Sequence, residues 1–196
     1  MKLANYWTII LFTTGLLIGL RAPSSAIHST ANTVNILLLL LMFSAGYYLA
    51  FHLEDFYHGL RDPQVSVLVS STLIGGALAG FLGSLITDLP LRESLAISMA
   101  SGWYSFAGAY IGAYDPMGGL IAFVGNLARE ALTLVVYPVL SRRDPLIGVT
   151  LGGATTMDTS LGIIARYSGP RTAGIAFAHG LVTTLLVPLL LPVIYP

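Results

Sequence analysis

The sequence contains no cysteine and few charged residues. Only 9% of its 196 residues are charged, whereas soluble domains average about 25%. The absence of cysteine excludes disulfides, thiol catalysis and cysteine-ligated metals. The charges of nine basic and nine acidic residues cancel, so the chain has no excess of positive charge that would indicate nucleic acid as a partner. The four histidines have no metal-binding spacing, so we expect neither a metal nor an organic cofactor.

Apolar residues dominate what is present: they make up 55% of the chain. The mean hydropathy is +0.80. Because a bilayer-spanning helix needs about 20 apolar residues, we predict an all-α polytopic membrane protein with about five to seven membrane segments. We expect one transmembrane domain, in which residues 1–64 form a helical hairpin and residues 65–196 a transport core. The clearest predicted helices cover residues 5–20, 33–51, 65–87, 120–140 and 172–195.

Two polar regions near the N-terminus leave alternatives open. The first apolar run ends at Arg21 and is followed by small residues, so a cleaved signal peptide is the alternative to a membrane helix. The connection from His52 to Gln64 is predicted to be a solvated loop. The alternative is a proton or metal relay that uses His52, Glu54 and His58, because helical spacing would place the last two on one face.

Two further segments are apolar overall but interrupted by glycines and hydroxyl residues. Ser94–Ala113 is too polar to face lipid, so we expect it to be buried in the bundle. The second segment, residues 152–160, reads Gly-Gly-Ala-Thr-Thr-Met-Asp-Thr-Ser. Glycines loosen a helix, and hydroxyls can pair the backbone groups that loosening exposes. We therefore predict two broken or re-entrant segments.

Asp158 and Glu130 are carboxylates at predicted membrane depth. Such acids are costly unless they face protein, water or a ligand, so they indicate a functional site. The structural alternatives are a helix cap for Asp158 and an ion pair for Glu130. Arg129 is adjacent to Glu130, and neighbours on a helix point about 100° apart. We therefore expect Arg129 to pair elsewhere, with Asp158 as one candidate.

An internal repeat is indicated by matches at an offset of 54 residues, for which chance matching in an apolar chain is the alternative. Residues 94–140 and 148–194 would be two copies of one unit, each with a broken segment followed by a long helix. Each copy supplies one acid, so a site between the copies would collect both. The matches pair Ile121-Ala122-Phe123 with Ile175-Ala176-Phe177, Pro116 with Pro170, Gly108 with Gly162, and Ser101 with Thr155.

Five motifs occur in a fixed order along the second half of the chain: Ser101-Gly102-Trp103-Tyr104-Ser105, Asn126-Leu127-Ala128-Arg129-Glu130, Gly152-Gly153-Ala154-Thr155-Thr156-Met157-Asp158-Thr159, Ser168-Gly169-Pro170 and Phe177-Ala178-His179-Gly180. Together they resemble the LysO-type lysine exporters, a family of prokaryotic inner-membrane proteins. The resemblance implies export of L-lysine and of toxic analogues such as thialysine, with the two intramembrane acids involved. The chain is shorter at its N-terminus than a usual member, so we expect a homo-oligomer or a separate small membrane subunit.

A proton and an ammonium group cannot occupy one carboxylate together, which would give proton/lysine antiport. We expect Asp158 to stay charged and Glu130 to exchange the proton, because hydroxyl residues surround only Asp158. Free amides or hydroxyls of Gly152–Thr156 would hold the substrate carboxylate. The expected site for substrate and protons comprises Glu130, Asp158, Arg129, Asn126, Thr155, Thr156, Thr159, Gly152, Gly153, Ser101 and Trp103.

Three other functions compete with this interpretation. The substrate-binding membrane subunit of an energy-coupling vitamin importer fits the size and hydropathy, but it would not need two intramembrane acids. Another amino-acid or cation exporter is also consistent. An intramembrane aspartyl protease would need Asp115 and Asp158 together, yet Asp115 precedes Pro116 in an apparent turn. We therefore predict a transporter and not an enzyme.

Overall fold

The computed structural model describes residues 53–196 and, before them, only isolated positions between 14 and 51. Its contacts divide the chain into two compact units, residues 1–48 and 49–196. Every helix discussed below belongs to the second unit. The predicted helices over residues 5–20 and 33–51 therefore lie almost entirely outside the described residues. Within residues 53–196 all regular elements are helical, as predicted.

Within residues 53–196, three helices are long and apolar enough to cross a membrane: α4 (Gln64–Ile86), α7 (Pro116–Leu140) and α9 (Leu161–Ile194). The chain is thus a multi-pass membrane protein. Helix α7 begins four residues before its predicted start, in what was expected to be a turn. The reason is a strong start signal: the Asp115 carboxylate accepts hydrogen bonds from the amides of Met117 and Gly118, and Pro116 occupies the first helical position.

The last helix differs from prediction at its start. We expected it to begin at about residue 172, but α9 already begins at Leu161. Gly169 interrupts it with φ +79° and ψ 177°, and the helix resumes at Pro170. A glycine adopts this conformation easily, and a proline suits the first turn of the helix that follows. Helix α9 thus consists of a short part, residues 161–168, and a long part, residues 170–194.

The predicted solvated loop before α4 is wrong, because helix α3 (Leu53–Arg61) occupies most of it. Its described polar side chains, Glu54, His58 and Arg61, are exposed. Among the described residues, no group of three or more His, Cys, Asp and Glu side chains is arranged to hold a metal ion.

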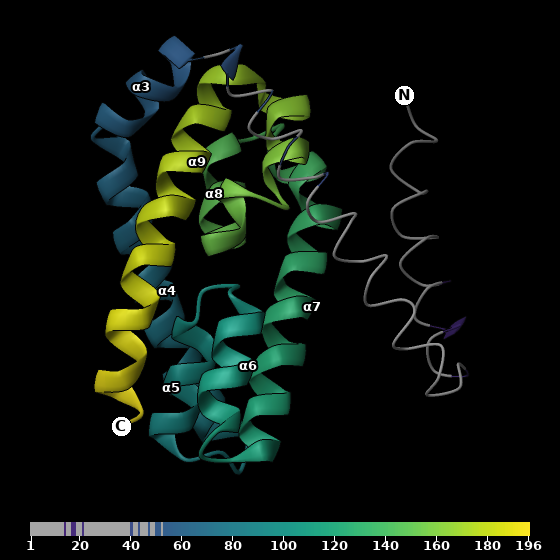
Figure 1. Ribbon diagram of the computed structural model, residues 1–196, viewed down its shortest axis with the longest axis vertical. Coiled ribbons are helices and arrows are strands. Elements are labelled where there is room, and N and C mark those ends of the chain that lie inside the picture. Colours follow the sequence, from purple (N-terminus) through teal and green to yellow (C-terminus); the bar gives the residue numbers. More distant parts are fainter. Residues whose placement is uncertain are drawn as a thin grey trace. The chain divides into compact units, whose positions relative to one another are not determined.

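Two helical hairpins of short limbs lie between the long helices. The first consists of α5 (Leu91–Met99) and α6 (Tyr104–Gly112), and the second of α8 (Pro145–Gly152), the 3₁₀ helix η1 (Gly153–Met157) and the short part of α9. A nine-residue helix rises only about 13.5 Å, less than half of the roughly 30 Å hydrocarbon core. Figure 1 shows α5 and α6 beside the lower half of α7 and α8 beside its upper half. Both predicted breaks are therefore present, as re-entrant hairpins.

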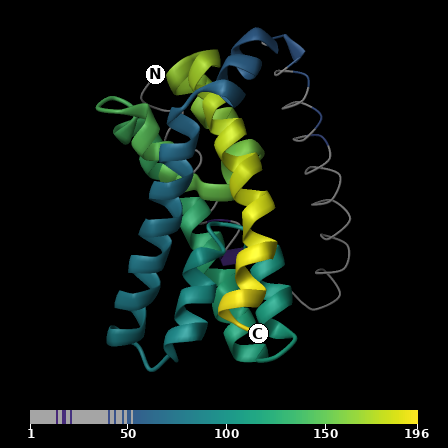
Figure 2. The ribbon, with the colours of Figure 1, turned by 90° about the vertical axis from the view of Figure 1, so that its left-hand side faces the viewer.

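The element boundaries follow the predicted repeat. The offset of 54 residues carries the start of α5 at Leu91 to the start of α8 at Pro145. The same offset carries both ends of α7, Pro116 and Leu140, to Pro170 and Ile194 in α9. Since α7 connects the lower hairpin to the upper one, the hairpins enter from opposite ends (Figures 1 and 2). The two copies therefore have inverted topology, as in many secondary transporters.

Each hairpin packs in its own apolar cluster. Val149 of α8 packs with residues of α4, Tyr137 of α7 and residues of α9. Ala96 of α5 and Ile111 of α6 pack with Ala122 of α7 and with the C-terminal part of α9. Helices α7 and α9 are common to both clusters, so they hold the two hairpins in a fixed relation.

A pair of carboxyl groups joins α5 to the start of α7. Glu93, in the first turn of α5, is 6% exposed. Its Oε1 fills the space that a side chain at Gly118 would occupy. Burial, and next the charge of the neighbouring Asp115, raises the pKa of Glu93 above its ordinary value. Protonated Glu93 can donate to Asp115, which gives Oε1 the partner that it otherwise lacks within the described residues.

Glu93→Gln is therefore expected to remove a pH-dependent loss of stability. A carboxyl whose pKa is raised by folding binds more protons when folded, so stability falls as pH rises from the ordinary Glu pKa of about 4.3 through the raised value. Glutamine resembles the protonated form and can still donate to Asp115. We expect the melting temperature of Glu93→Gln to exceed that of the wild type by a few degrees at about pH 8. The two melting temperatures should converge at about pH 4. Melting in detergent across this range tests the prediction, with exposed Glu54→Gln as control. Parallel pH profiles of Glu93→Gln and wild type would contradict it.

Candidate functional site

The tips of the two hairpins touch each other. The Ala154 amide donates to the Ser101 carbonyl at 2.8 Å. Ser101 and Gly102 at the first tip have φ values of 54° and 92°, and Gly153 at the second has 64°, all in the left-handed region. A Cβ on Gly102 would lie 2.9 Å from the Gly152 carbonyl oxygen. Glycine at both tips thus allows two backbones to meet at close range.

Asn126 of α7 anchors the first tip. Its Oδ1 accepts from the Gly102 amide at 2.8 Å, and its Nδ2 donates to the carbonyls of Ile97 and Ala122, each at 2.9 Å. One buried amide side chain therefore pairs a backbone amide in the break between α5 and α6 and a carbonyl of α5, and backbone groups of a re-entrant segment require such partners in a membrane.

His179 and Thr156 anchor the second tip. Thr156 Oγ1 lies 2.8 Å from the Ala176 carbonyl oxygen and 3.0 Å from His179 Nδ1. The other ring nitrogen, Nε2, lies 2.9 Å from Thr72 Oγ1 of α4. The fully buried His179 thus connects η1 to α4 and has both ring nitrogens engaged. Thr155 Oγ1 pairs with the Gly152 carbonyl and with Ser160 Oγ.

The structure brings the two predicted acids together. Glu130 is 7% exposed. Its carboxyl group interacts with the Thr159 side chain and with the charge of Asp158. Asp158 accepts from the Thr159 amide at 2.5 Å and from the Thr159 hydroxyl at 3.3 Å. Glu130 Oε2 has no hydrogen-bond partner within the described residues. The two acids and Thr159 are hereafter the acid cluster.

Tyr104 interacts electrostatically with both acids of the cluster. Tyr104 was not among the expected site residues. The signal that could have found it is the repeat, because the offset of 54 residues aligns Tyr104 with Asp158. In an inverted repeat, aligned positions are related by a two-fold axis, and those near the axis lie close together, as Tyr104 and Asp158 do.

Arg129 does not pair with Asp158, and that candidate pairing is wrong. Arg129 Nε donates to the Leu151 carbonyl at 2.8 Å, and Nη2 donates to the Thr150 carbonyl at 3.2 Å. These carbonyls end α8, where a cation offsets the negative end of the helix dipole. Between residues 53 and 196 no carboxylate lies within 4.0 Å of this guanidinium.

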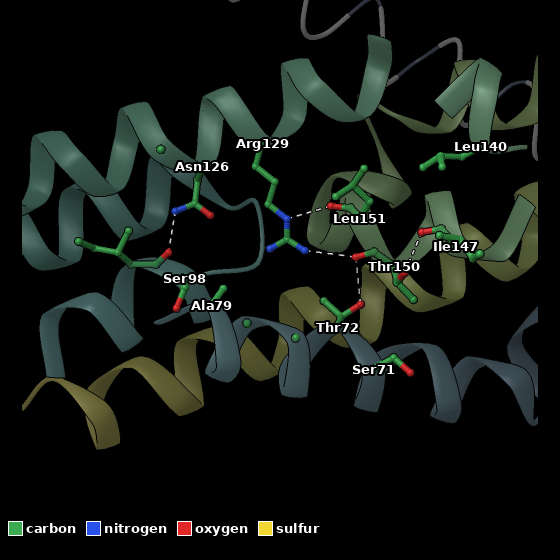
Figure 3. A pocket seen from close by; sticks show the side chains of 14 residues that line it. Ser71, Thr72, Ala79, Ser98, Asn126, Arg129, Leu140, Ile147, Thr150 and Leu151 are labelled. Atoms are coloured by element: carbon green, nitrogen blue, oxygen red, sulfur yellow. Dashed lines mark hydrogen bonds between the residues drawn. The ribbon is translucent and has the colours of Figure 1, made fainter. Parts of the chain in front are cut away.

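A cavity of about 560 Å³ lies between α4, α5, α7 and α8. Figure 3 shows Arg129 and Asn126 reaching into it from α7, opposite Ser71 and Thr72 of α4. Neither acid of the cluster lines this cavity, hereafter the Arg129 pocket. Arg129 and Glu130 are adjacent in α7 but face different sites, because neighbours on a helix point about 100° apart.

The other predicted site residues lie at or near the hairpin tips. Gly152, Gly153, Thr155 and Thr156 are buried where the tips meet, and Ser101 is fully buried there. Trp103 packs against Phe106, with ring centroids 4.9 Å apart. None of these residues lines the Arg129 pocket. The geometry assigns them to holding the tips.

Comparison with known proteins places this arrangement in a family. The family model described as "Lysine exporter LysO" matches residues 9–195. The lysine exporter LysO of Escherichia coli (strain K12) is 35% identical over 182 residues, which cover 90% of this chain and 59% of that protein. A putative lysine exporter of Haemophilus influenzae is 37% identical over 127 residues, which cover 64% of this chain and 63% of that protein.

The matched residues thus span about three fifths of each relative's length. No solved structure matches the chain. The family match agrees with the multi-pass membrane location. The chain belongs to the lysine exporter LysO family.

Proposed function

We propose that the chain exports L-lysine and analogues such as thialysine across the cell membrane, in exchange for protons. The observation that carries the proposal is the acid cluster: the buried carboxyl group of Glu130 lies near the half-buried one of Asp158, and one Glu130 oxygen lacks a hydrogen-bond partner within the described residues. Membrane carboxylates without a fixed cation are characteristic of ion and substrate paths. The names of the two relatives supply lysine as the substrate to test.

Lysine has two ammonium groups, and the cluster has two acids. An ammonium group and a proton compete for the same carboxyl oxygen, so binding of one releases the other. Repetition of this exchange on the two sides of the membrane couples lysine efflux to proton entry. The inverted repeat supports this mechanism, because two hairpins of opposite orientation can open the same central site to either side.

Survival on thialysine tests the proposal. Cells that lack their own lysine exporter and express the chain are expected to tolerate concentrations that stop growth of the parent strain. The double variant Glu130→Gln/Asp158→Asn, expressed at the same membrane level, is expected to give no protection. Equal sensitivity with and without a well-expressed wild-type chain would count against lysine as the substrate.

We also propose that the chain works as a homo-oligomer or with a separate small membrane subunit. Liposomes that contain only the purified chain distinguish these states. Lysine/proton exchange by the chain alone supports self-sufficiency, and activity that appears only when a second membrane protein is added supports a subunit.

A further inference from the structure

The structure leaves few free hydrogen-bond donors for the substrate carboxylate at Gly152–Thr156, where the sequence predicted them. At the second tip the Gly153 amide donates to the Val149 carbonyl and the Ala154 amide to the Ser101 carbonyl. The hydroxyls of Thr155 and Thr156 are both engaged in hydrogen bonds within the fold. A carboxylate has only acceptors and needs donors or a cation. The carboxylate end of the substrate must therefore find them elsewhere.

The Arg129 pocket has a suitable size and one suitable group. Its volume of about 560 Å³ falls within the range of small-molecule sites. Among the described residues, Arg129 is the only charged one that lines it. The other polar side chains of the lining use their donors on backbone carbonyls of the protein, as the hydrogen bonds of Ser71, Thr72, Ser98, Asn126 and Thr150 show.

Arg129 itself retains donors. Its two hydrogen bonds to the end of α8 use Nε and Nη2, and Nη1 has no hydrogen-bond partner within residues 53–196. In Figure 3 this third nitrogen carries no dashed line and points to the side of the pocket where Asn126 and Ser98 lie. The bonds to α8 hold the guanidinium in place, so little side-chain freedom remains to be lost when an anion binds.

We propose that Arg129 binds the carboxylate of the exported amino acid in this pocket. The inference rests on the proposed function and adds the recognition of the acid end of the substrate. A guanidinium forms short, charge-assisted hydrogen bonds with a carboxylate and selects it over neutral groups. Arg129 and the acid cluster would then recognise the carboxylate and the ammonium groups of the substrate at separate places beside α7, since neither acid lines the pocket. A diamine without a carboxylate would lack the interaction with Arg129.

Binding of lysine and of cadaverine to the purified full chain tests the inference. Cadaverine keeps both amino groups of lysine and lacks the carboxylate. We expect Arg129→Gln to weaken lysine binding by about 10- to 100-fold, the effect of losing a hydrogen bond to a charged group. Cadaverine binding is expected to stay within about threefold of wild type, since no carboxylate contact is lost. Arg129→Lys keeps the charge and is expected to fall between the two, and Arg142→Gln, in an exposed turn, is the control.

An equal loss of lysine and cadaverine binding in Arg129→Gln would overturn the inference, because it would show that Arg129 acts only by capping α8. Should the glutamine variant not fold, the wild type supplies the second measurement: lysine must bind at least about tenfold more tightly than its methyl ester. Equal binding of the two compounds would also overturn the inference. If the folded wild type binds neither lysine nor cadaverine, the proposed function fails, and this inference fails with it.

Discussion

Asp158→Asn is expected to lower lysine binding by about 100-fold or more, the effect of removing one partner of a buried ion pair. The Asp158 carboxylate accepts from both the amide and the hydroxyl of Thr159. These donors favour its ionised form and hold it as a fixed anchor for an ammonium group. Asparagine keeps the shape but removes the charge that an ammonium group needs.

Glu130→Gln is expected to abolish proton-coupled export while lysine binding and lysine-for-lysine exchange persist. Glu130 is buried, and its Oε2 has no donor within the described part of the chain, so its charge has less support than that of Asp158. It is therefore the residue suited to alternate between the protonated and ionised forms. Glutamine resembles the protonated form and cannot release a proton.

Purified protein in liposomes separates these outcomes. Lysine binding, lysine-for-lysine exchange and export driven by a pH gradient are measured for each variant, with exposed Asp88→Asn and Glu54→Gln as matched controls. The reverse pattern, in which Asp158→Asn binds normally and Glu130→Gln does not, would exchange the two roles. Wild-type behaviour of both variants would remove the acids from the transport path.

The long helices and the breaks could be predicted because each has a local cause. Apolar length identifies α4, α7 and α9, and paired glycines with hydroxyls identify the break at Gly152 and Gly153. The repeat could also be predicted, since Pro116 and Pro170 begin equivalent helices. The sequence pattern could not predict how deep in the membrane each break lies. That depth depends on limb length, and only the structure shows that α5 and α8 are too short to cross.

The hydrogen-bond partners of Arg129 and of the threonines at the second tip could not be predicted. Arg129 was expected to find a carboxylate, but it binds the carbonyls of Thr150 and Leu151, because a broken helix leaves its last carbonyls without partners. The same reason explains why Thr155 and Thr156 turn inward instead of facing substrate. In a re-entrant segment the backbone groups at the break need hydrogen-bond partners, and nearby polar side chains provide them.

Gly153→Ala is expected to abolish export and to destabilise the fold by several kcal/mol. Gly153 has φ 64° and ψ −131°, a conformation almost closed to other residues. Such backbone strain costs about 1–3 kcal/mol. A Cβ would also overlap the Ser101 carbonyl oxygen, and over-packing of this kind typically costs about 1–3 kcal/mol more. Both effects push the tips apart and break the hydrogen bond from Ala154 to Ser101.

Gly162→Ala provides the matched control, because a Cβ at this helical glycine of α9 would meet no heavy atom within 4 Å. Melting in detergent and lysine exchange in liposomes are measured for both variants. The control is expected to behave as wild type or to be slightly more stable, since alanine favours a helix over glycine by about 1 kcal/mol. If Gly153→Ala melts and exchanges lysine as the wild type does, contact between the tips is not needed for transport, and the hairpins must then act independently. If the variant folds but does not exchange, the contact itself belongs to the transport cycle, because Asp158 and Thr159 of the acid cluster directly follow the second tip in the chain.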